Sequence, residues 1–137
     1  MHIVVAGSRG WMDTDLLYST LDAFIEPLLE MHSPSSALQD GPITIISGTA
    51  HGADTMGERW AESRDIPILR MPADWETHGR RAGYLRNEQM AAIADHVFVF
   101  WDGVSRGSQH MIDIATRMDI PVDVITQTSF GLRVSQD

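Results

Sequence analysis

Arginine and glycine occur together in several short segments of this chain, and that combination suits the binding of a phosphate-like anion. The first segment, residues 7–11 (GSRGW), places Ser8 and Arg9 beside Gly7. Glycine lets the backbone approach a ligand closely, and both the serine hydroxyl and the guanidinium donate hydrogen bonds to anions. A plain tight turn explains the same residues equally well, so this segment alone does not define a site.

Two further segments of small residues stand directly before predicted helices. Residues 47–54 (SGTAHGAD) contribute Gly48, Gly52 and Asp54, and residues 101–108 (WDGVSRGS) run into the last predicted helix. The free N–H groups and the dipole at a helix N-terminus favour a bound anion. The first spacing is neither the GxGxxG fingerprint nor a P-loop. Asp54 could accept from ribose hydroxyls or cap its helix, and the sequence leaves both open.

The segment 101–108 supplies candidates of two kinds. Asp102 ends a predicted buried strand, where a carboxylate could meet ribose hydroxyls. The small residues after it form a second anion-binding arrangement before a helix, with a structural turn as the alternative. These candidate binding residues are Gly103, Ser105, Gly107 and Ser108.

Residues 72–83 form a long predicted loop, and long loops in small domains are typical of functional sites. The loop carries Trp75 and His78, both candidates to contact a ligand. Arg86 and Asn87 follow on the predicted first turn of the next helix, where they could face the same ligand.

Three of the four tryptophans follow predicted strand ends. Trp11, Trp75 and Trp101 therefore map to the expected ligand crevice, where a base or another flat ring could stack. Packing at the rim of the core is the alternative for one or two of them. Trp60 stands at helical spacing from Met56 and is expected in the core.

The elements that position these segments alternate along the chain, as in a parallel sheet with crossover helices. We expect an α/β fold, a Rossmann-like doubly wound parallel five-stranded sheet with helices on both faces, in which ligands bind at the carboxyl ends of the strands. One domain spans residues 1–126, and a polar C-terminal tail spans 127–137. The strands cover residues 2–6, 43–46, 66–70, 96–101 and 121–125, and the helices cover 14–31, 54–64, 84–94 and 107–118.

Composition and charge narrow the class of protein. The chain has 137 residues, a net charge of −9 and no cysteine, and all ten of its basic residues are arginine. Its acidity argues against a general nucleic-acid binder, so we do not expect nucleic acid as a partner. Because the chain has no lysine, it has no Walker lysine and no Schiff-base lysine. Arginine, in contrast, can bind phosphate through two parallel hydrogen bonds. The histidines and carboxylates show no metal-binding spacing, so we expect no metal and no cofactor.

The apolar segments are too short for a membrane protein. No apolar run approaches the roughly 20 residues of a membrane span. The apolar start at residues 3–6 lacks a basic flank and is too short for a signal peptide. We therefore expect a cytoplasmic protein without contact to a membrane.

Taken together, the segments resemble the YspA-like branch of the SLOG superfamily, Rossmann-like proteins related to the LOG phosphoribohydrolases and to DprA. The matching pieces follow one another over nearly the whole chain. They are GSR at 7–9, GxAxGAD at 48–54, PADW at 72–75, GxxAGxxRNxxM at 79–90 and WDGxSxGS at 101–108. The resemblance implies a nucleotide or nucleotide-derived ligand held by the glycine-rich loops, and a homodimer.

The LOG enzymes cleave an N-glycosidic bond with an arginine and a glutamate. Arg86 matches that arginine, but Met111 occupies the position of the glutamate, and a thioether cannot do the work of a carboxylate. Asp54, Asp74 or Asp102 could substitute, and we take Arg86, Asp54 and Asp102 as candidate catalytic residues.

Three functional hypotheses follow from these residues. The first is the binding or sensing of a nucleotide or another ribose-phosphate ligand. The second is a nucleoside-monophosphate phosphoribohydrolase or related N-glycosidase. The third is a protein-interaction domain that retains a disused pocket.

Overall fold

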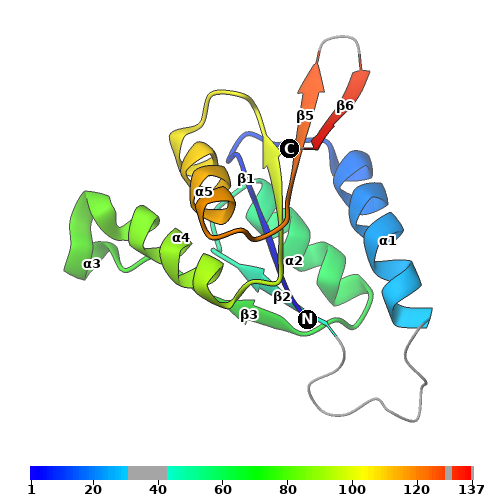
Figure 1. Cartoon of the computed structure of the whole chain (residues 1–137), viewed down its shortest axis with the longest axis horizontal. Helices are drawn as coiled ribbons and strands as arrows, with labels where there is room; N and C mark the ends of the chain where they lie inside the picture. The colour runs from blue at the N-terminus through cyan, green and yellow to red at the C-terminus, as the bar shows by residue number, and fades with distance from the viewer. Residues whose placement is uncertain (31–42, 129–130, 137) are drawn as a thin grey trace.

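Strand β1 (His2–Gly7) is buried on both sides because helices cover both faces of the sheet. In the computed structural model, which describes residues 1–30, 43–128 and 131–136, α1 (Thr14–Glu30) and α2 (Ala53–Ser63) lie on one face. Helices α4 (Ala82–Ile93) and α5 (Arg106–Arg117) lie on the other, as Figure 1 shows.

The sheet has six strands in the order β3-β2-β1-β4-β5-β6. The first five run parallel, and the order reverses direction between β1 and β4, which is the doubly wound arrangement. The predicted parallel five-stranded α/β fold is therefore confirmed. The other strands are β2 (Thr44–Ser47), β3 (Ile68–Arg70), β4 (His96–Trp101), β5 (Val122–Thr128) and β6 (Gly131–Gln136).

The C-terminal residues depart from the prediction of a polar tail over 127–137. Strand β5 continues to Thr128, and β6 pairs antiparallel with it, Ile125 opposite Val134. Leu132 and Val134 alternate with polar residues, a period of two that is typical of a strand. A strand of six residues is too short to stand out in the sequence without its partner strand.

Alternate residues of β1 belong to two separate hydrophobic cores, one on each face of the sheet. Ile3 and Val5 pack against α1 and α2, while Val4 and Ala6 pack against α4 and α5. Helix α2 lies close to the sheet at Gly57, where an added Cβ would stand 2.6 Å from a methyl carbon of Val5. Trp60 is fully buried in the first core, as predicted.

The segment predicted as a loop over 72–83 is largely helical. It contains the short helix α3 (Trp75–His78) and a 3₁₀ turn, η2 (Gly79–Arg81), and α4 then begins at Ala82. The side chain of Asp74 accepts the backbone N–H of Thr77 at 3.1 Å and so caps α3. Because α4 starts two residues before its predicted start, Arg86 lies on its second turn, one turn later than expected.

Helices in the described ranges lack the combination of length and apolar character that a bilayer crossing requires.

Candidate functional site

A hollow of about 410 Å³ opens at the carboxyl ends of β1 and β4, beside the N-terminal turn of α5. The loops after β1, β2 and β4, the connection between β3 and α4, and the helices α4 and α5 form its wall. Ten of the residues predicted as a site line it: Gly7, Arg9, Asp54, Trp75, Arg86, Asn87, Asp102, Ser105, Gly107 and Ser108.

A second hollow of about 350 Å³ adjoins the first, toward the ends of β2 and β3. It is lined by the β2–α2 loop, including Gly48 and His51, and shares four residues with the first hollow: Arg9, Ala50, Trp75 and Arg86. The two guanidinium groups and the indole therefore border both spaces.

Arg86 crosses from α4 to the opposite loop. Its guanidinium donates to the carbonyl oxygen of Gly48, and its Nε donates to Asn87 Oδ1 at 3.2 Å. The loop leaves room for the guanidinium because residue 48 is glycine: an added Cβ would lie 2.5 Å from an Arg86 nitrogen. Partial burial lowers the pKa of Arg86, with Asp54 opposing this and Arg9 reinforcing it.

Asn87 ties Arg86 to the other side of the hollow. Its Nδ2 donates to the carbonyl of Gly107 at 3.2 Å and lies 3.2 Å from His110 Nδ1. The His110 ring meets Tyr84 edge-on, with 4.6 Å between the ring centroids. Asn87 is 6% exposed, so its amide hardly contacts solvent. Its hydrogen bonds instead orient the side chain of Arg86.

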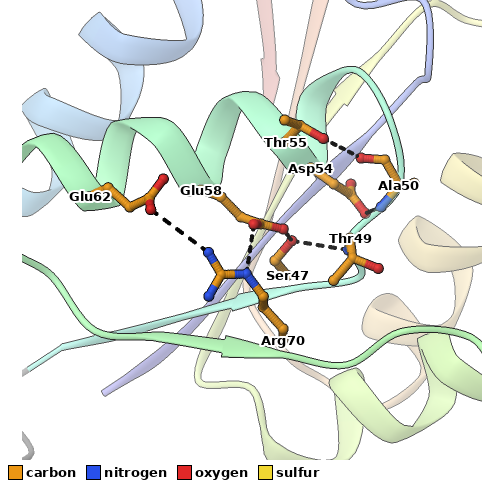
Figure 2. Close-up of polar contacts among 8 residues, drawn as sticks. All are labelled: Ser47, Thr49, Ala50, Asp54, Thr55, Glu58, Glu62 and Arg70. Atoms are coloured by element: carbon orange, nitrogen blue, oxygen red, sulfur yellow. Dashed lines mark hydrogen bonds and ion pairs between the residues drawn. The ribbon is translucent and has the colours of Figure 1, made fainter.

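Asp54 lies in the first turn of α2 and is 4% exposed. Burial raises its pKa to about 6, although the N–H of Ala50 and the charges of Arg86 and Arg9 act in the opposite direction. Its Oδ2 accepts the Ala50 N–H at 3.2 Å, a contact drawn in Figure 2. The alternative interpretation of Asp54 as the helix cap is wrong, because the N-cap of α2 is Gly52.

Three serine hydroxyls connect the loops after β1 and β4. Ser8 Oγ lies 3.2 Å from Ser105 Oγ, and Ser105 Oγ donates to Ser108 Oγ at 2.7 Å. Ser105 is also the N-cap of α5, but its side chain makes no capping hydrogen bond to the helix. The first turn of α5, with Gly107 and Ser108, therefore borders the hollow with its N–H groups unclaimed by a capping side chain.

Asp102 organises its own loop. One oxygen, Oδ1, accepts the N–H groups of Val104 and Ser105, both at 2.8 Å. These backbone hydrogen bonds lower the pKa of Asp102, so it is a carboxylate at neutral pH. It lines the hollow, but its accepting oxygen is already occupied by the turn.

Four predicted binding residues do not line either hollow. Ser8 is buried beneath the loops, Gly103 lies in the Asp102 turn, and His78 is exposed at the end of α3. Gly52 has a φ of 81° and packs against the backbone of the β1 loop, where an added Cβ would stand 2.3 Å from the Arg9 carbonyl oxygen. Glycine at position 52 therefore allows the two loops to pack closely and does not contact a ligand in either hollow.

Only one of the three tryptophans predicted at the crevice lines it. Trp75 is 53% exposed and borders both hollows. Trp11 is buried against Phe100, with 5.6 Å between ring centroids, and Trp101 packs in the second core and donates to the Ser105 carbonyl. A position directly after a strand therefore did not show whether a tryptophan contacts a ligand or packs at the rim of the core.

Several residues that line the first hollow were not predicted from the sequence. Tyr84 and Met90 lie three residues before and three residues after Asn87 on α4, a helical spacing that could have found them. Met111 is 1% exposed, as a core side chain would be, and it also lines the hollow. The other lining residues outside the predicted site are Ala6, Gly10, Ala50, Arg80 and Gly83.

Within the described ranges, no three histidine or carboxylate side chains converge as metal ligands would.

The strand order and the ligand-sized hollow at the carboxyl ends define a Rossmann-like α/β domain. The chain belongs to the YspA, cpYpsA-related SLOG family, whose model matches residues 1–78, and the predicted membership of the SLOG superfamily is confirmed. The Gene 61 protein of Mycobacterium phage D29 is 34% identical over 127 residues, which cover 88% of this chain and 93% of that protein.

Among solved structures, the DNA processing protein A (DprA) of Streptococcus pneumoniae is similar in fold, with a TM-score of 0.61 and 16% identity. The match covers 88% of this chain and 48% of the DprA chain, so this chain spans about half of DprA. At that identity the likeness concerns the fold alone.

Proposed function

We propose that the hollow at the ends of β1 and β4 binds a nucleotide or nucleotide-derived ligand through its phosphate. The observation that carries the proposal is the half-buried guanidinium of Arg86 in a wall that also includes the N-terminal turn of α5. A partly desolvated guanidinium and a helix N-terminus both favour a compact anion. Membership of the SLOG family supports a nucleotide-related ligand.

The rest of the hollow suits the organic part of such a ligand. Trp75 offers a half-exposed ring on which a base could stack, and the lining also includes the apolar side chains of Met90 and Met111, each of them 1% exposed. The volume of about 410 Å³ lies within the usual range for small-molecule sites.

A thermal-shift and calorimetric series tests this proposal. The series contains AMP, ADP, ribose 5-phosphate, inorganic phosphate and adenosine, and we expect the phosphate-bearing nucleotides to stabilise the protein. A ligand at 100 times its Kd adds about 2.7 kcal/mol. Arg86→Ala should abolish the shift, while Arg59→Ala on the exposed side of α2 should preserve it. No binding of any nucleotide by the wild-type protein would refute the proposal.

Hydrolysis of an N-glycosidic bond is the second candidate, favoured by the raised pKa of Asp54 beside Arg86. In that reaction AMP and water give adenine and ribose 5-phosphate. A carboxyl group that titrates near pH 6 could give a proton to the leaving base or take one from the attacking water. Met111 lines the hollow without acid–base capacity. Chromatography for free adenine tests this reaction, with Asp54→Asn as the inactive control.

Other expectations remain proposals. The similarity to a protein named for DNA processing gives no support to our expectation that nucleic acid is not a partner, which rests on the net charge of −9. The homodimer and the cytoplasmic location also stay predictions. A pocket that binds no nucleotide, together with a co-purifying protein, would favour the interaction-domain hypothesis.

A further inference from the structure

The loop between β2 and α2 contains a non-glycine residue in a backbone conformation that glycine normally occupies. Thr49 has a φ of 65°, in the left-handed region where a side chain is strained. Such a conformation persists only where surrounding contacts determine it, and these residues concentrate at functional sites.

A chain of three side chains fixes this conformation. Ser47 Oγ accepts the N–H of Thr49 at 3.1 Å and donates to Glu58 Oε2 at 2.6 Å. The other carboxylate oxygen of Glu58, Oε1, accepts from Arg70 Nε at 2.8 Å. Figure 2 shows this path from the loop through α2 to the end of β3.

The inner members of the chain are shielded from water and the outer ones are not. Ser47 is 1% exposed and the side chain of Glu58 is 13% exposed, whereas that of Arg70 is 49% exposed. Glu62 approaches Arg70 only to 4.0 Å and is 61% exposed. A shielded carboxylate needs a partner for each oxygen, and Glu58 has two.

Further side chains of α2 hold the neighbouring residue of the same loop. Asp54 accepts the N–H of Ala50, and Thr55 Oγ1 donates to the Ala50 carbonyl at 2.8 Å. Gly48 lies between Ser47 and Thr49, and its carbonyl accepts from Arg86. The Gly48 carbonyl and the Thr49 N–H belong to one planar peptide group. The hydrogen bond from that N–H to Ser47 and the φ of Thr49 therefore set the orientation of the carbonyl, and with it the position of the guanidinium.

We propose that Ser47 and Glu58 are positioning residues of the binding hollow: by holding Thr49 in the left-handed conformation they orient the Gly48 carbonyl that fixes the Arg86 guanidinium. The role of the hollow as a nucleotide site is the proposed function, on which this inference rests for its ligand. The effect on Arg86 itself requires no ligand.

The first measurement is the Nε–Hε resonance of Arg86 in the ligand-free, full-length protein, assigned with Arg86→Lys. Ser47→Ala should shift and broaden this resonance while the amide spectrum stays that of a folded protein. Glu58→Gln, which keeps an acceptor for Ser47 but loses the ion pair, should have a smaller effect. The matched controls are Ser63→Ala at the far end of α2 and Glu62→Gln, and both should leave the resonance unchanged.

A rescue experiment separates positioning from general stability. Glycine adopts a positive φ without strain, so Thr49→Gly in the Ser47→Ala background should restore the Arg86 resonance. In a titration with AMP, Ser47→Ala should weaken binding about tenfold, the loss expected from roughly one hydrogen bond, and the double variant should recover most of it.

Each outcome bears on one claim. An unchanged Arg86 resonance in folded Ser47→Ala, or no recovery with Thr49→Gly, overturns the positioning role. A shifted resonance that recovers with glycine, in a protein that binds no AMP or any other nucleotide of the series, supports the positioning role and refutes the proposed function instead.

Discussion

The hydroxyl oxygen of Ser8 accepts the backbone N–H of Asp102 at 2.9 Å, which joins the loop after β1 to the loop after β4 across 94 positions of sequence. The backbone of Ser8 takes part as well, because its carbonyl accepts from Trp11 and Ala53. Ser8 therefore holds together the loops that surround the hollow, and it does not line the hollow as the sequence predicted.

Ser8→Ala should lower the free energy of unfolding by about 1–2 kcal/mol, because the Asp102 N–H loses its acceptor in a partly buried place. Urea denaturation at pH 7 measures this difference. Ser19→Ala is the matched control, since that hydroxyl donates to a carbonyl of its own helix on the exposed side of α1, and it should change stability by less than about 0.5 kcal/mol. Equal effects of the two variants would contradict the role of Ser8.

Gly52→Ala should destabilise the protein by on the order of 3 kcal/mol or more. Two penalties combine there: a φ of 81° that alanine resists, and a Cβ placed 2.3 Å from the Arg9 carbonyl oxygen and 2.4 Å from that of Ser8. Gly10→Ala provides the comparison, because a Cβ added at that position would meet nothing within 4 Å. Thermal melts of both variants test the difference, and similar melting temperatures would show that the two loops are not packed as described.

The sheet could be predicted from sequence because each parallel strand is a short apolar run of its own. His96–Trp101 is such a run, and both faces of it are indeed covered. Where contacts with other elements determine the local structure, the prediction of helices and strands from the sequence was incomplete. Pro27 lies late in the predicted helix over 14–31, where a proline is expected to end or kink a helix, and α1 continues past it to Glu30. The polar segment 33–42, rich in proline and serine and therefore predicted as a loop, lies outside the described residues.

The site was predicted in outline by the rule that ligands bind at the carboxyl ends of parallel strands. The rule identifies the loops that surround the site. Burial in the structure then shows which residues of these loops line the hollow. Gly7 ends β1 and Gly52 ends the loop after β2, but only Gly7 lines the hollow, since Gly52 is covered by the backbone of Ser8 and Arg9. The contact of Arg86 with Gly48 spans 38 positions, and no local sequence pattern encodes it.

Asp54→Asn should stabilise the protein at pH 8 by on the order of 2 kcal/mol and have little effect near pH 4. Burial raises the pKa of Asp54 from 3.8 to about 6, so between these pH values the folded state binds more protons than the unfolded state. Stability then falls as pH rises from about 4 to about 6, and asparagine removes that loss. The difference between the two stability curves isolates this group, and a difference that is constant with pH would disprove the shifted pKa.

The same carboxyl group should make phosphate binding depend on pH. Above about pH 6 Asp54 is ionised, and its charge opposes an anion held by Arg86 in the same hollow. The phosphate monoester of AMP also titrates near pH 6, so the quantity to compare is the ratio of the wild-type Kd to that of Asp54→Asn. We expect the wild-type protein to bind AMP about tenfold more weakly than the variant at pH 8, and the ratio to approach one at pH 5, as Asp54 becomes protonated. Calorimetric titrations at both pH values measure the ratio, because the titration of the ligand is common to both proteins and cancels. A ratio that rises as the pH falls would mean that the ionised carboxylate helps to hold the ligand, as it would if it accepted from ribose hydroxyls.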